Sequence, residues 1–183
     1  MVQITSSQIK KWKMWSDLFV VWLTMLGTLA GGGYALVQYL DNSNAERAKE
    51  TLKFVERFDK DRLYESRQRI DMALEQMEDE LRKKLKEGES EYQAHLKAGI
   101  KDKLLFYHLN QIFDFYDQLH ACSVANLCDA DISLRFFGKY AYDLVGTIYP
   151  YIEQQKTQSG DAQYGSGIKF YFSKYKEQQD KQP

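Results

Sequence analysis

The chain has 183 residues, a formal net charge of −1, two cysteines and only two prolines. Its near-neutral charge, with no basic patch interleaved with aromatic residues, argues against a nucleic-acid partner. Two cysteines are too few for a disulfide scaffold. The length predicts one domain with an accessory segment, and the scarcity of proline and of strand-like runs predicts an all-α fold.

The first predicted element is an apolar segment near the N-terminus. Residues 18–40, "LFVVWLTMLGTLAGGGYALVQYL", contain no Asp, Glu, Lys or Arg. A helix of this length spans about 35 Å, which is enough for the roughly 30 Å hydrocarbon core of a bilayer. We therefore predict an N-terminal tail over 1–17 and a single transmembrane helix over 18–40. Trp12, Trp15 and Tyr39 flank the apolar run and are predicted interfacial anchors.

A secretory signal peptide is the alternative interpretation of this segment. Lys10, Lys11 and Lys13 would form its charged region, and residues 28–30 would supply a cleavage site of the small-x-small type. However, the apolar character resumes after the glycines, over residues 34–40. This continuation favours an anchor that stays attached to the chain.

Small residues follow one face of the predicted membrane helix. Gly27, Gly31 and Ala35 are spaced by four residues, and Thr24 and Thr28 fall close to the same stripe. Stripes of this kind let a second membrane helix approach closely. Two interpretations stay open: the stripe is a helix-packing seam, or a lone anchor simply contains small residues.

Basic residues near the apolar segment bear on its orientation. The tail holds three lysines, whereas residues 41–60 hold five basic residues: Arg47, Lys49, Lys53, Arg57 and Lys60. The positive-inside rule then favours a bacterial inner-membrane protein with a cytoplasmic C-terminal domain. The short lysine-containing tail would have to cross the membrane in that orientation.

Residues 44–158 are predicted to form a small antiparallel helical bundle. A turn or kink is expected at residues 59–61, a helix end at Gly88 and a connection over residues 88–100. Apolar residues recur at helical spacing in the first two stretches: Ala48, Leu52, Val55 and Phe58, then Ile70, Leu74, Met77, Leu81 and Leu85.

The third stretch is the most apolar and is predicted to be the central helix, with Leu105, Leu109, Ile112, Tyr116 and Leu119 on one face. Asp129 or Asp131 can cap a fourth helix, whose predicted face is Ile132, Phe136, Tyr140, Leu144 and Ile148. Pro150 should kink or end that helix. Residues 159–183 are predicted to be an aromatic segment, either a short helix or extended, followed by a flexible tail.

No catalytic signature occurs in the sequence, so we expect a protein that is not an enzyme and needs no cofactor. Asp117, His120, Cys122 and Cys128 are the nearest approach to a metal site, but Cys-x₅-Cys is not a usual zinc spacing. We therefore expect no metal. The two cysteines form a candidate thiol pair, either a disulfide in an oxidising compartment or two thiols in a reducing one. His108 is interpreted as structural.

Two stretches after the anchor carry a resemblance to other proteins: "NAERAKETLKFVERFDKDRLYESRQRI" and "LNQIFDFYDQLHACSVANLCDADISLRFFGKYAYDLVGTIYPYIEQQ". Over roughly residues 18–155 the chain resembles an uncharacterised bacterial family of membrane-anchored all-helical proteins of unknown function. The resemblance implies an anchor followed by a helical soluble domain. That family has no established catalytic residues, so the resemblance implies none in this chain.

The leading hypothesis is a single-pass membrane-anchored accessory or scaffolding subunit. Its small-residue seam would pack in the lipid bilayer, while the helical domain would bind other membrane protein subunits or a second copy of the chain. The alternative is a membrane-tethered sensor or regulator of the stress or phage-defence type. No small-molecule substrate is evident from the sequence.

Overall fold

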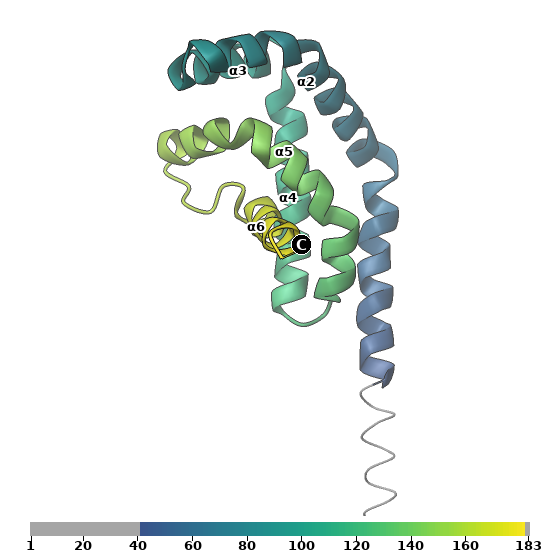
Figure 1. Cartoon of the computed structure of the whole chain (residues 1–183). Helices are drawn as coiled ribbons and strands as arrows, with labels where there is room; N and C mark the ends of the chain where they lie inside the picture. Colours follow the sequence, from purple (N-terminus) through teal and green to yellow (C-terminus); the bar gives the residue numbers. More distant parts are fainter. Residues whose placement is uncertain (1–40, 182–183) are drawn as a thin grey trace, which may run out of the picture. The chain divides into compact units, whose positions relative to one another are not determined.

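The computed structural model describes residues 41–181 and contains helices but no strands within that range, which confirms the all-α class. Residues 41–58 are helical and precede the helices labelled in Figure 1: α2 (Asp61–Glu87), α3 (Glu89–Asp102), α4 (Leu105–Val124), α5 (Ala130–Ser159) and α6 (Ser166–Gln179). None of the helices in the described range is both long and apolar enough to cross a membrane. The predicted tail, 1–17, and membrane helix, 18–40, lie outside the described residues.

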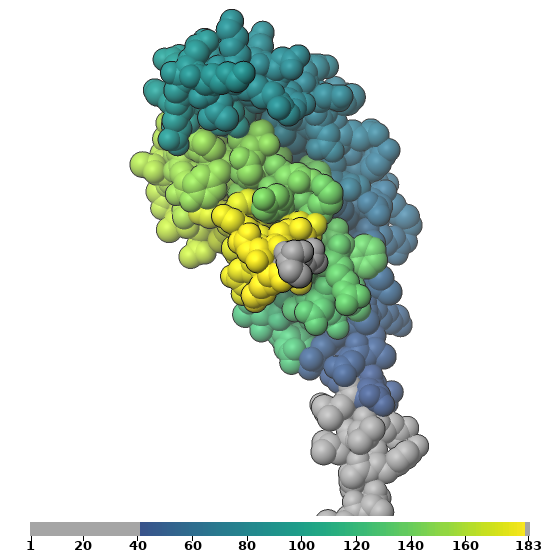
Figure 2. Space-filling view, in the orientation of Figure 1, coloured from purple at the N-terminus to yellow at the C-terminus, as the bar shows by residue number. Residues whose placement is uncertain are grey.

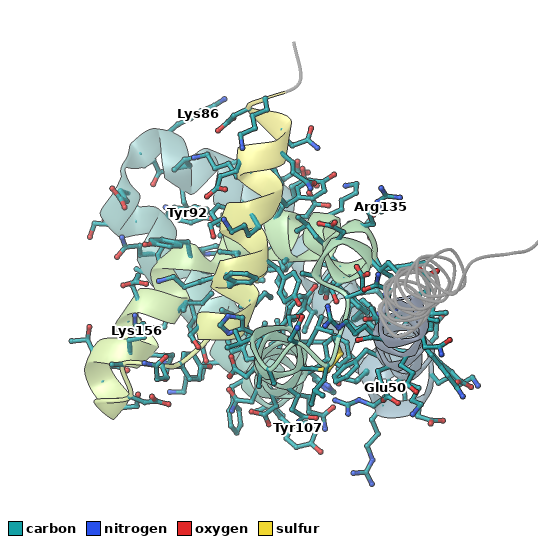
Figure 3. All side chains as sticks on the ribbon, turned by 90° about the horizontal axis from the view of Figure 1, so that it is seen from below. Glu50, Lys86, Tyr92, Tyr107, Arg135 and Lys156 are labelled. Atoms are coloured by element: carbon teal, nitrogen blue, oxygen red, sulfur yellow. A yellow bond between two sulfur atoms is a disulfide. The ribbon has the colours of Figure 1, made fainter. Side chains whose placement is uncertain are left out.

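The chain from residue 46 onward forms one compact helical unit. Within it, α4 packs against α2, α3 and α6, and α5 packs against α6 and α3. Figure 2 shows α6, in yellow, against α5, in green, on one face of the unit. Charged side chains such as Lys86 and Arg135 are exposed and lie at its periphery (Figure 3).

Helix α4 is the centre of the hydrophobic core. The five residues of its predicted face are each at most 2 % exposed: Leu105, Leu109, Ile112, Tyr116 and Leu119. Phe113 and Phe115 are equally buried and widen this face. The Tyr116 hydroxyl still finds a partner, because it donates a hydrogen bond of 2.8 Å to the carbonyl oxygen of Phe137 on α5. The spacing in the sequence therefore predicted the core helix correctly.

The ends of the helices follow local signals in the sequence. The break before α2 lies at residues 59–60, and Asp61 takes a left-handed conformation with φ of 53°. Gly88 ends α2 with φ of 149°, a conformation that glycine adopts without steric cost. Asp129 caps α5 by accepting a 2.8 Å hydrogen bond from the Ile132 amide. Each of these ends was predicted at or next to the observed residue.

The predicted connection over residues 88–100 is wrong, because residues 89–102 form helix α3. Leu96 and Ile100 are buried, and Tyr92 is half-buried one turn earlier. The Tyr92 hydroxyl donates a 2.7 Å hydrogen bond to the Thr147 carbonyl oxygen on α5. Three apolar residues among many polar ones are a weak periodic signal, and contact with α5 and the neighbouring helices fixes this helix instead.

The predicted buried face of α5 is also partly wrong. Phe136 is 54 % exposed and Tyr140 is only partly buried, whereas Phe137 and Val145 are core residues. A strict four-residue step advances about 40° too far on each turn of a helix with 3.6 residues per turn. The predicted stripe therefore crosses the edge of the core: Leu144 and Ile148 are buried, whereas Phe136 and Tyr140 lie near the edge.

Pro150 lies inside α5 and does not end it, since the helix continues to Ser159. Proline lacks an amide donor, so the carbonyl oxygen four residues earlier, on Gly146, loses its usual partner. Figure 1 shows that α5 changes direction along its length. Of the two outcomes expected for Pro150, a kink or a helix end, the structure shows the kink.

The aromatic segment near the C-terminus forms α6, which packs on α4 and α5. Its first turn is held by Asp117 of α4, whose carboxylate accepts a 2.7 Å hydrogen bond from the Gly167 amide. Burial raises the pKa of Asp117, although this hydrogen bond opposes the rise. The helical bundle therefore extends past residue 158 and includes α6.

Gly167 should be intolerant of even a single methyl group. A Cβ at this position would lie 2.5 Å from the Tyr116 carbonyl oxygen and 2.6 Å from the Asp117 amide nitrogen, and neither backbone atom can move cheaply. Gly167→Ala should lower the free energy of unfolding by about 1–3 kcal/mol, as overpacking does. Urea unfolding of the full chain in mild detergent, followed by circular dichroism, measures the change.

Gly146→Ala provides the matched control, because nothing lies within 4 Å of its added Cβ. Alanine is favoured over glycine in a helix interior by about 0.5–1 kcal/mol, so this variant should be at least as stable as the wild type. Equal stability of the two variants would contradict the close packing of α6 on α4.

Candidate functional site

The candidate site is a groove between α2 and α5. It consists of two adjoining hollows, of about 300 Å³ and 430 Å³, that share Tyr140 and Asp143 in their linings. Both volumes are in the range of small ligand sites. We call this feature the α2–α5 groove; from α2 it is lined by Arg67, Asp71, Leu74, Glu75 and Glu78, and from α5 by Phe136, Phe137, Lys139, Tyr140, Asp143, Leu144 and Thr147.

Helical spacing brings these side chains to the groove. Arg67 and Asp71 are one turn apart on α2, and Tyr140 and Asp143 are three residues apart on α5, so each pair shares a helix face. Tyr140 belongs to the part of the predicted α5 face that lies at the edge of the core, and this position places it at the groove. The site is therefore built from residues at the edge of the packed faces.

Arg67 lies in the α2 wall and is held on several sides. Its side chain is 19 % exposed and donates a 2.7 Å hydrogen bond to the Asp59 carboxylate. Its guanidinium lies over the Phe58 ring, 4.0 Å from the ring centroid, in a cation–π contact. Its Nε atom is buried and has no hydrogen-bond partner in the described structure.

Tyr140 faces Arg67 and Asp71 from α5. Its hydroxyl oxygen is buried beside the Asp71 carboxylate. Burial raises the pKa of Tyr140, and the negative charge of Asp71 and hydrogen bonding to that carboxylate raise it further. The state of Tyr140 is therefore tied to that of Asp71.

Asp71 is in an unfavourable electrostatic position. Desolvation raises the pKa of this carboxyl and the nearby charge of Asp143 adds to the rise, whereas the charge of Arg67 and hydrogen bonding to Tyr140 lower it. Asp71 is exposed to solvent. Two carboxylates from different helices thus face the same hollow and repel each other.

The groove as a whole is negative. Lys139 pairs with Asp143 at 2.6 Å, but both are largely exposed, so this pair contributes little. Five carboxylates, on Asp59, Asp71, Glu75, Glu78 and Asp143, line the two hollows against two cations, on Arg67 and Lys139. Carboxylates are hydrogen-bond acceptors only, so the groove suits a positively charged ligand with donor groups.

A serine–histidine contact occurs elsewhere, between α2 and α4. The buried Ser66 hydroxyl donates to the Gln111 side-chain oxygen at 2.7 Å and contacts His108 Nδ1 at 3.0 Å. A hydroxyl has one proton, so with Gln111 Oε1 as its acceptor the imidazole Nδ1 is the donor in the second contact. The contact joins two helices, in keeping with a structural role.

The four residues considered for a metal site contribute to the packing of the fold instead. Asp117 holds the start of α6, and the His120 ring packs on Phe170 with centroids 4.4 Å apart. Cys122 and Cys128 are joined by a disulfide, with their Cα atoms 5.3 Å apart. Across residues 41–181 no cluster of three or more His, Cys, Asp or Glu side chains is arranged to hold a metal ion.

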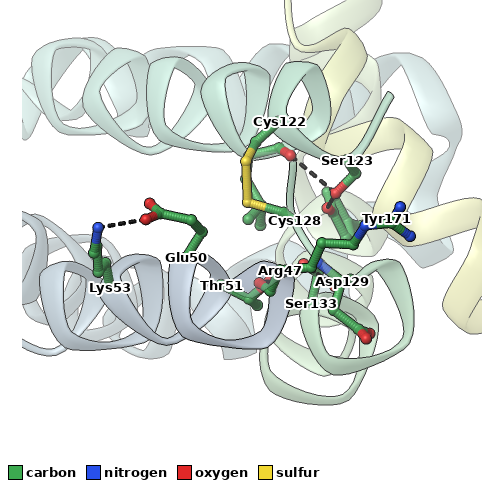
Figure 4. The surroundings of a disulfide bond; sticks show 11 residues. Arg47, Glu50, Thr51, Lys53, Cys122, Ser123, Cys128, Asp129, Ser133 and Tyr171 are labelled. Atoms are coloured by element: carbon green, nitrogen blue, oxygen red, sulfur yellow. Dashed lines mark hydrogen bonds and ion pairs between the residues drawn. A yellow bond between two sulfur atoms is a disulfide. The ribbon is translucent and has the colours of Figure 1, made fainter. Parts of the chain in front are cut away.

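The disulfide closes the corner between α4 and α5 (Figure 4). Directly after it, the Asp129 amide donates a 2.8 Å hydrogen bond to the hydroxyl of Thr51. Thr51 is fully buried, and its hydroxyl donates a 3.0 Å hydrogen bond to the Arg47 carbonyl oxygen. The corner therefore links the start of α5 to the helical residues before α2.

The groove residues were not among the predicted functional residues. The predicted seam (Thr24, Gly27, Thr28, Gly31 and Ala35) and the predicted anchors (Trp12, Trp15 and Tyr39) lie outside the described residues. Pairs such as Arg67 with Asp71 are visible in the sequence as neighbours on one helix face. The sequence does not show that α5 places Tyr140 and Asp143 opposite Arg67 and Asp71.

Comparison of the chain with protein-family models, with curated proteins and with solved structures found no match. Family membership is therefore not shown, and the site is argued from its own geometry. The fold and site define an all-helical domain with a negatively charged groove.

The electrostatic position of Asp71 gives a pH-dependent prediction. The folded protein binds the Asp71 proton more tightly than the unfolded chain, so ionisation of this carboxyl destabilises the fold above its raised pKa. Asp71→Asn should raise the melting temperature of the full chain at pH 7. The gain should shrink as the pH falls through the raised pKa, and vanish below the unfolded value of about 3.9.

Asp79→Asn is the control, because Asp79 is an exposed residue of α2 that does not line the groove. Its effect should stay within about 0.5 kcal/mol at either pH. Thermal unfolding at pH 7 and at acidic pH compares the variants. An Asp71→Asn protein that melts below the wild type at pH 7 would show that Asp71 stabilises the fold.

Proposed function

We propose that the protein is a single-pass membrane-anchored accessory subunit whose helical domain binds a partner in the α2–α5 groove. The observation that carries this proposal is the α2–α5 groove, whose two hollows are lined by five carboxylates and two cations. A groove lined mainly by one sign of charge attracts a partner of the opposite sign. This charge supports recognition of another molecule.

The anchor and the groove would act together on one partner. In this proposal residues 18–40 form a helix in the bacterial inner membrane, and Gly27 and Gly31 pack against a membrane helix of the same complex. A chain held in the bilayer presents its groove at a high effective concentration, so each contact can be weak while the pair is strong. The partner is another membrane protein subunit or a second copy of the chain.

The disulfide bears on the side of the membrane that the helical domain faces. Disulfides persist in oxidising compartments and are rare in the cytosol. We therefore propose that the domain containing Cys122 and Cys128 faces the oxidising side, which reverses the orientation expected from the basic residues of 41–60. The three lysines of the short tail then stay in the cytoplasm, as the positive-inside rule prefers for short flanks.

The alternative function, a membrane-tethered sensor or regulator, is favoured by the same open groove. A hollow of about 430 Å³ is large enough for a small ligand that would act as the signal. Such a ligand would change the association state of the full chain. An accessory subunit would instead keep a constant stoichiometry with its partner whether or not the ligand is present.

The seam is tested by replacing its two glycines. The variant Gly27→Leu/Gly31→Leu should lose the partner when the full chain is purified in mild detergent, because two leucine side chains hold the membrane helices apart. Gly33→Leu/Val37→Leu changes two residues of the same apolar run that fall on the opposite face of a helix, and should retain the partner. Equal recovery of the partner with both variants would contradict the seam.

The orientation is tested by trapping the thiols inside intact cells. Cells are quenched with acid, and the denatured chain is treated with a maleimide of high mass before or after reduction. If the domain faces the oxidising side, labelling should appear only after reduction. Labelling of both cysteines without reductant would place the domain in the cytoplasm, and a Cys122→Ser/Cys128→Ser chain identifies the unlabelled band.

A further inference from the structure

We propose that the corner between α4 and α5 inserts the side chains of Val124 and Leu127 into the headgroup layer of the lipid bilayer. We call residues 124–127 the α4–α5 corner. This surface is separate from the α2–α5 groove, so it goes beyond the partner contact of the proposed function. The inference rests on that proposal only through the membrane anchor of residues 18–40.

The α4–α5 corner is an apolar point on the surface of the helical unit. Val124 is 72 % exposed and Leu127 is 62 % exposed, and the two residues between them are exposed as well. The disulfide of Cys122 and Cys128 closes the chain around them (Figure 4). Exposed apolar residues are common on protein surfaces, so exposure alone does not indicate a partner. Three further features of this corner do.

The corner and the helix end before it carry no charged side chain. Residues 118–128, "QLHACSVANLC", contain no Asp, Glu, Lys or Arg, although these four types make up 28 % of the chain. His120, within this stretch, packs on the Phe170 ring of α6. The last turn of α4 also lacks the basic residue that the helix dipole favours there. Bringing a charged side chain out of water is costly, so an uncharged stretch is suited to contact with lipid.

The backbone amides of the corner are satisfied within the corner itself. Each amide of residues 125–128 donates a hydrogen bond to a carbonyl oxygen near the end of α4. The four donor–acceptor pairs are Ala125 to Ala121 (2.9 Å), Asn126 to Ser123 (3.1 Å), Leu127 to Cys122 (3.0 Å) and Cys128 to Cys122 (3.2 Å). An unpaired amide costs free energy where lipid replaces water. The corner can therefore leave water without stranding an amide.

The chain itself ties the corner to the predicted anchor. The Thr51 hydroxyl donates a hydrogen bond to the Arg47 carbonyl oxygen and accepts one from the Asp129 amide, two residues after Leu127. Arg47 follows Leu40, the last residue of the predicted membrane helix, by seven residues, which reach at most about 25 Å. The start of α4 lies about 30 Å from the corner, because this helix has 20 residues. Of the two ends of α4, the corner is the one tied to the anchor.

A bilayer fits the corner better than a second protein does. Standard protein interfaces bury about 800 Å² on each partner, far more than two aliphatic side chains supply. Association with a lipid interface grows with the apolar area inserted and needs no shaped partner surface. Because the anchor would already hold the chain at the bilayer, even a small apolar point is enough to make the contact.

The test is photo-crosslinking of the full chain in vesicles of phosphatidylethanolamine and phosphatidylglycerol. The photoreactive variant is Leu127→p-benzoylphenylalanine. Leu104→p-benzoylphenylalanine is the matched control, because Leu104 is 71 % exposed and lies at the other end of α4. Irradiation joins the benzophenone to a C–H bond within its reach. We expect intact-mass spectra to show a phospholipid adduct that is severalfold more abundant with the probe at position 127 than at position 104.

A charge introduced into the corner should remove the contact. Val124→Glu, combined with the probe at position 127, should lower the yield of the lipid adduct severalfold, because a carboxylate is costly to insert among lipids. Val124 is largely exposed, so this variant should fold. Leu104→Glu, with the same probe at position 127, is the control and should leave the yield unchanged.

Three results would overturn the inference. They are equal adduct yields at positions 127 and 104, a cross-link from position 127 to a second copy of the chain in place of lipid, and an unchanged yield in Val124→Glu. An alkaline carbonate wash of the vesicles separates these failures from failure of the proposed function. A chain that is retained without a lipid adduct at position 127 keeps its anchor and loses only the corner contact. A chain that washes out contradicts the anchor itself.

Discussion

The contact of Phe58 with three other helices fixes the geometry on which the rest of the domain depends. Its ring stacks on Phe115 of α4 at a centroid distance of 4.9 Å and meets Phe137 of α5 edge-on at 5.2 Å. On another side it carries the Arg67 guanidinium of α2 at 4.0 Å. One side chain therefore sets the spacing of α2, α4 and α5. Aromatic pairs in these arrangements contribute about 0.5–1.5 kcal/mol each beyond the area they bury.

This cluster also explains why a groove exists between α2 and α5. Helix α2 packs on α4, and Phe137 of α5 contacts both Phe115 of α4 and Phe58, which lines the hollow that contains Arg67. Along the other hollow the walls carry Asp71 and Asp143, which are exposed to solvent. The apolar cluster joins the helices, and the groove is lined by charged residues that stay exposed.

Local signals in the sequence were enough to predict much of the fold. The face of α4 from Leu105 to Leu119 is regular in its spacing and wholly apolar, so packing and periodicity agree. Gly88 and Asp129 act through their own backbone and side-chain chemistry and need no tertiary contact to be recognised. Where periodicity was weak, as in α3, or drifted, as in α5, contacts between distant segments decided the outcome.

The groove could not be predicted from the sequence, because it too depends on contacts between distant segments. Asp71, Tyr140 and Asp143 each look like ordinary residues at the edge of an amphipathic helix, and their unusual state arises only when two helices face each other. A single helix face cannot reveal which groups of another helix its hydroxyl or carboxylate will meet. The two cysteines differ from the groove residues, because the sequence alone identifies them as a candidate pair. Whether their sulfur atoms are bonded depends on the folded corner between α4 and α5.

The disulfide corner and the groove are connected through α5. Cys128 directly precedes Asp129, which caps α5 with its carboxylate and bonds Thr51 with its amide. Tyr140 and Asp143 follow three to four turns later on the same helix, so the start of α5 sets how these side chains face α2. The Cys122–Cys128 disulfide constrains this corner, so it also limits how the groove residues of α5 can move relative to α2. In the proposed function, the disulfide would therefore help to preorganise the groove for its partner.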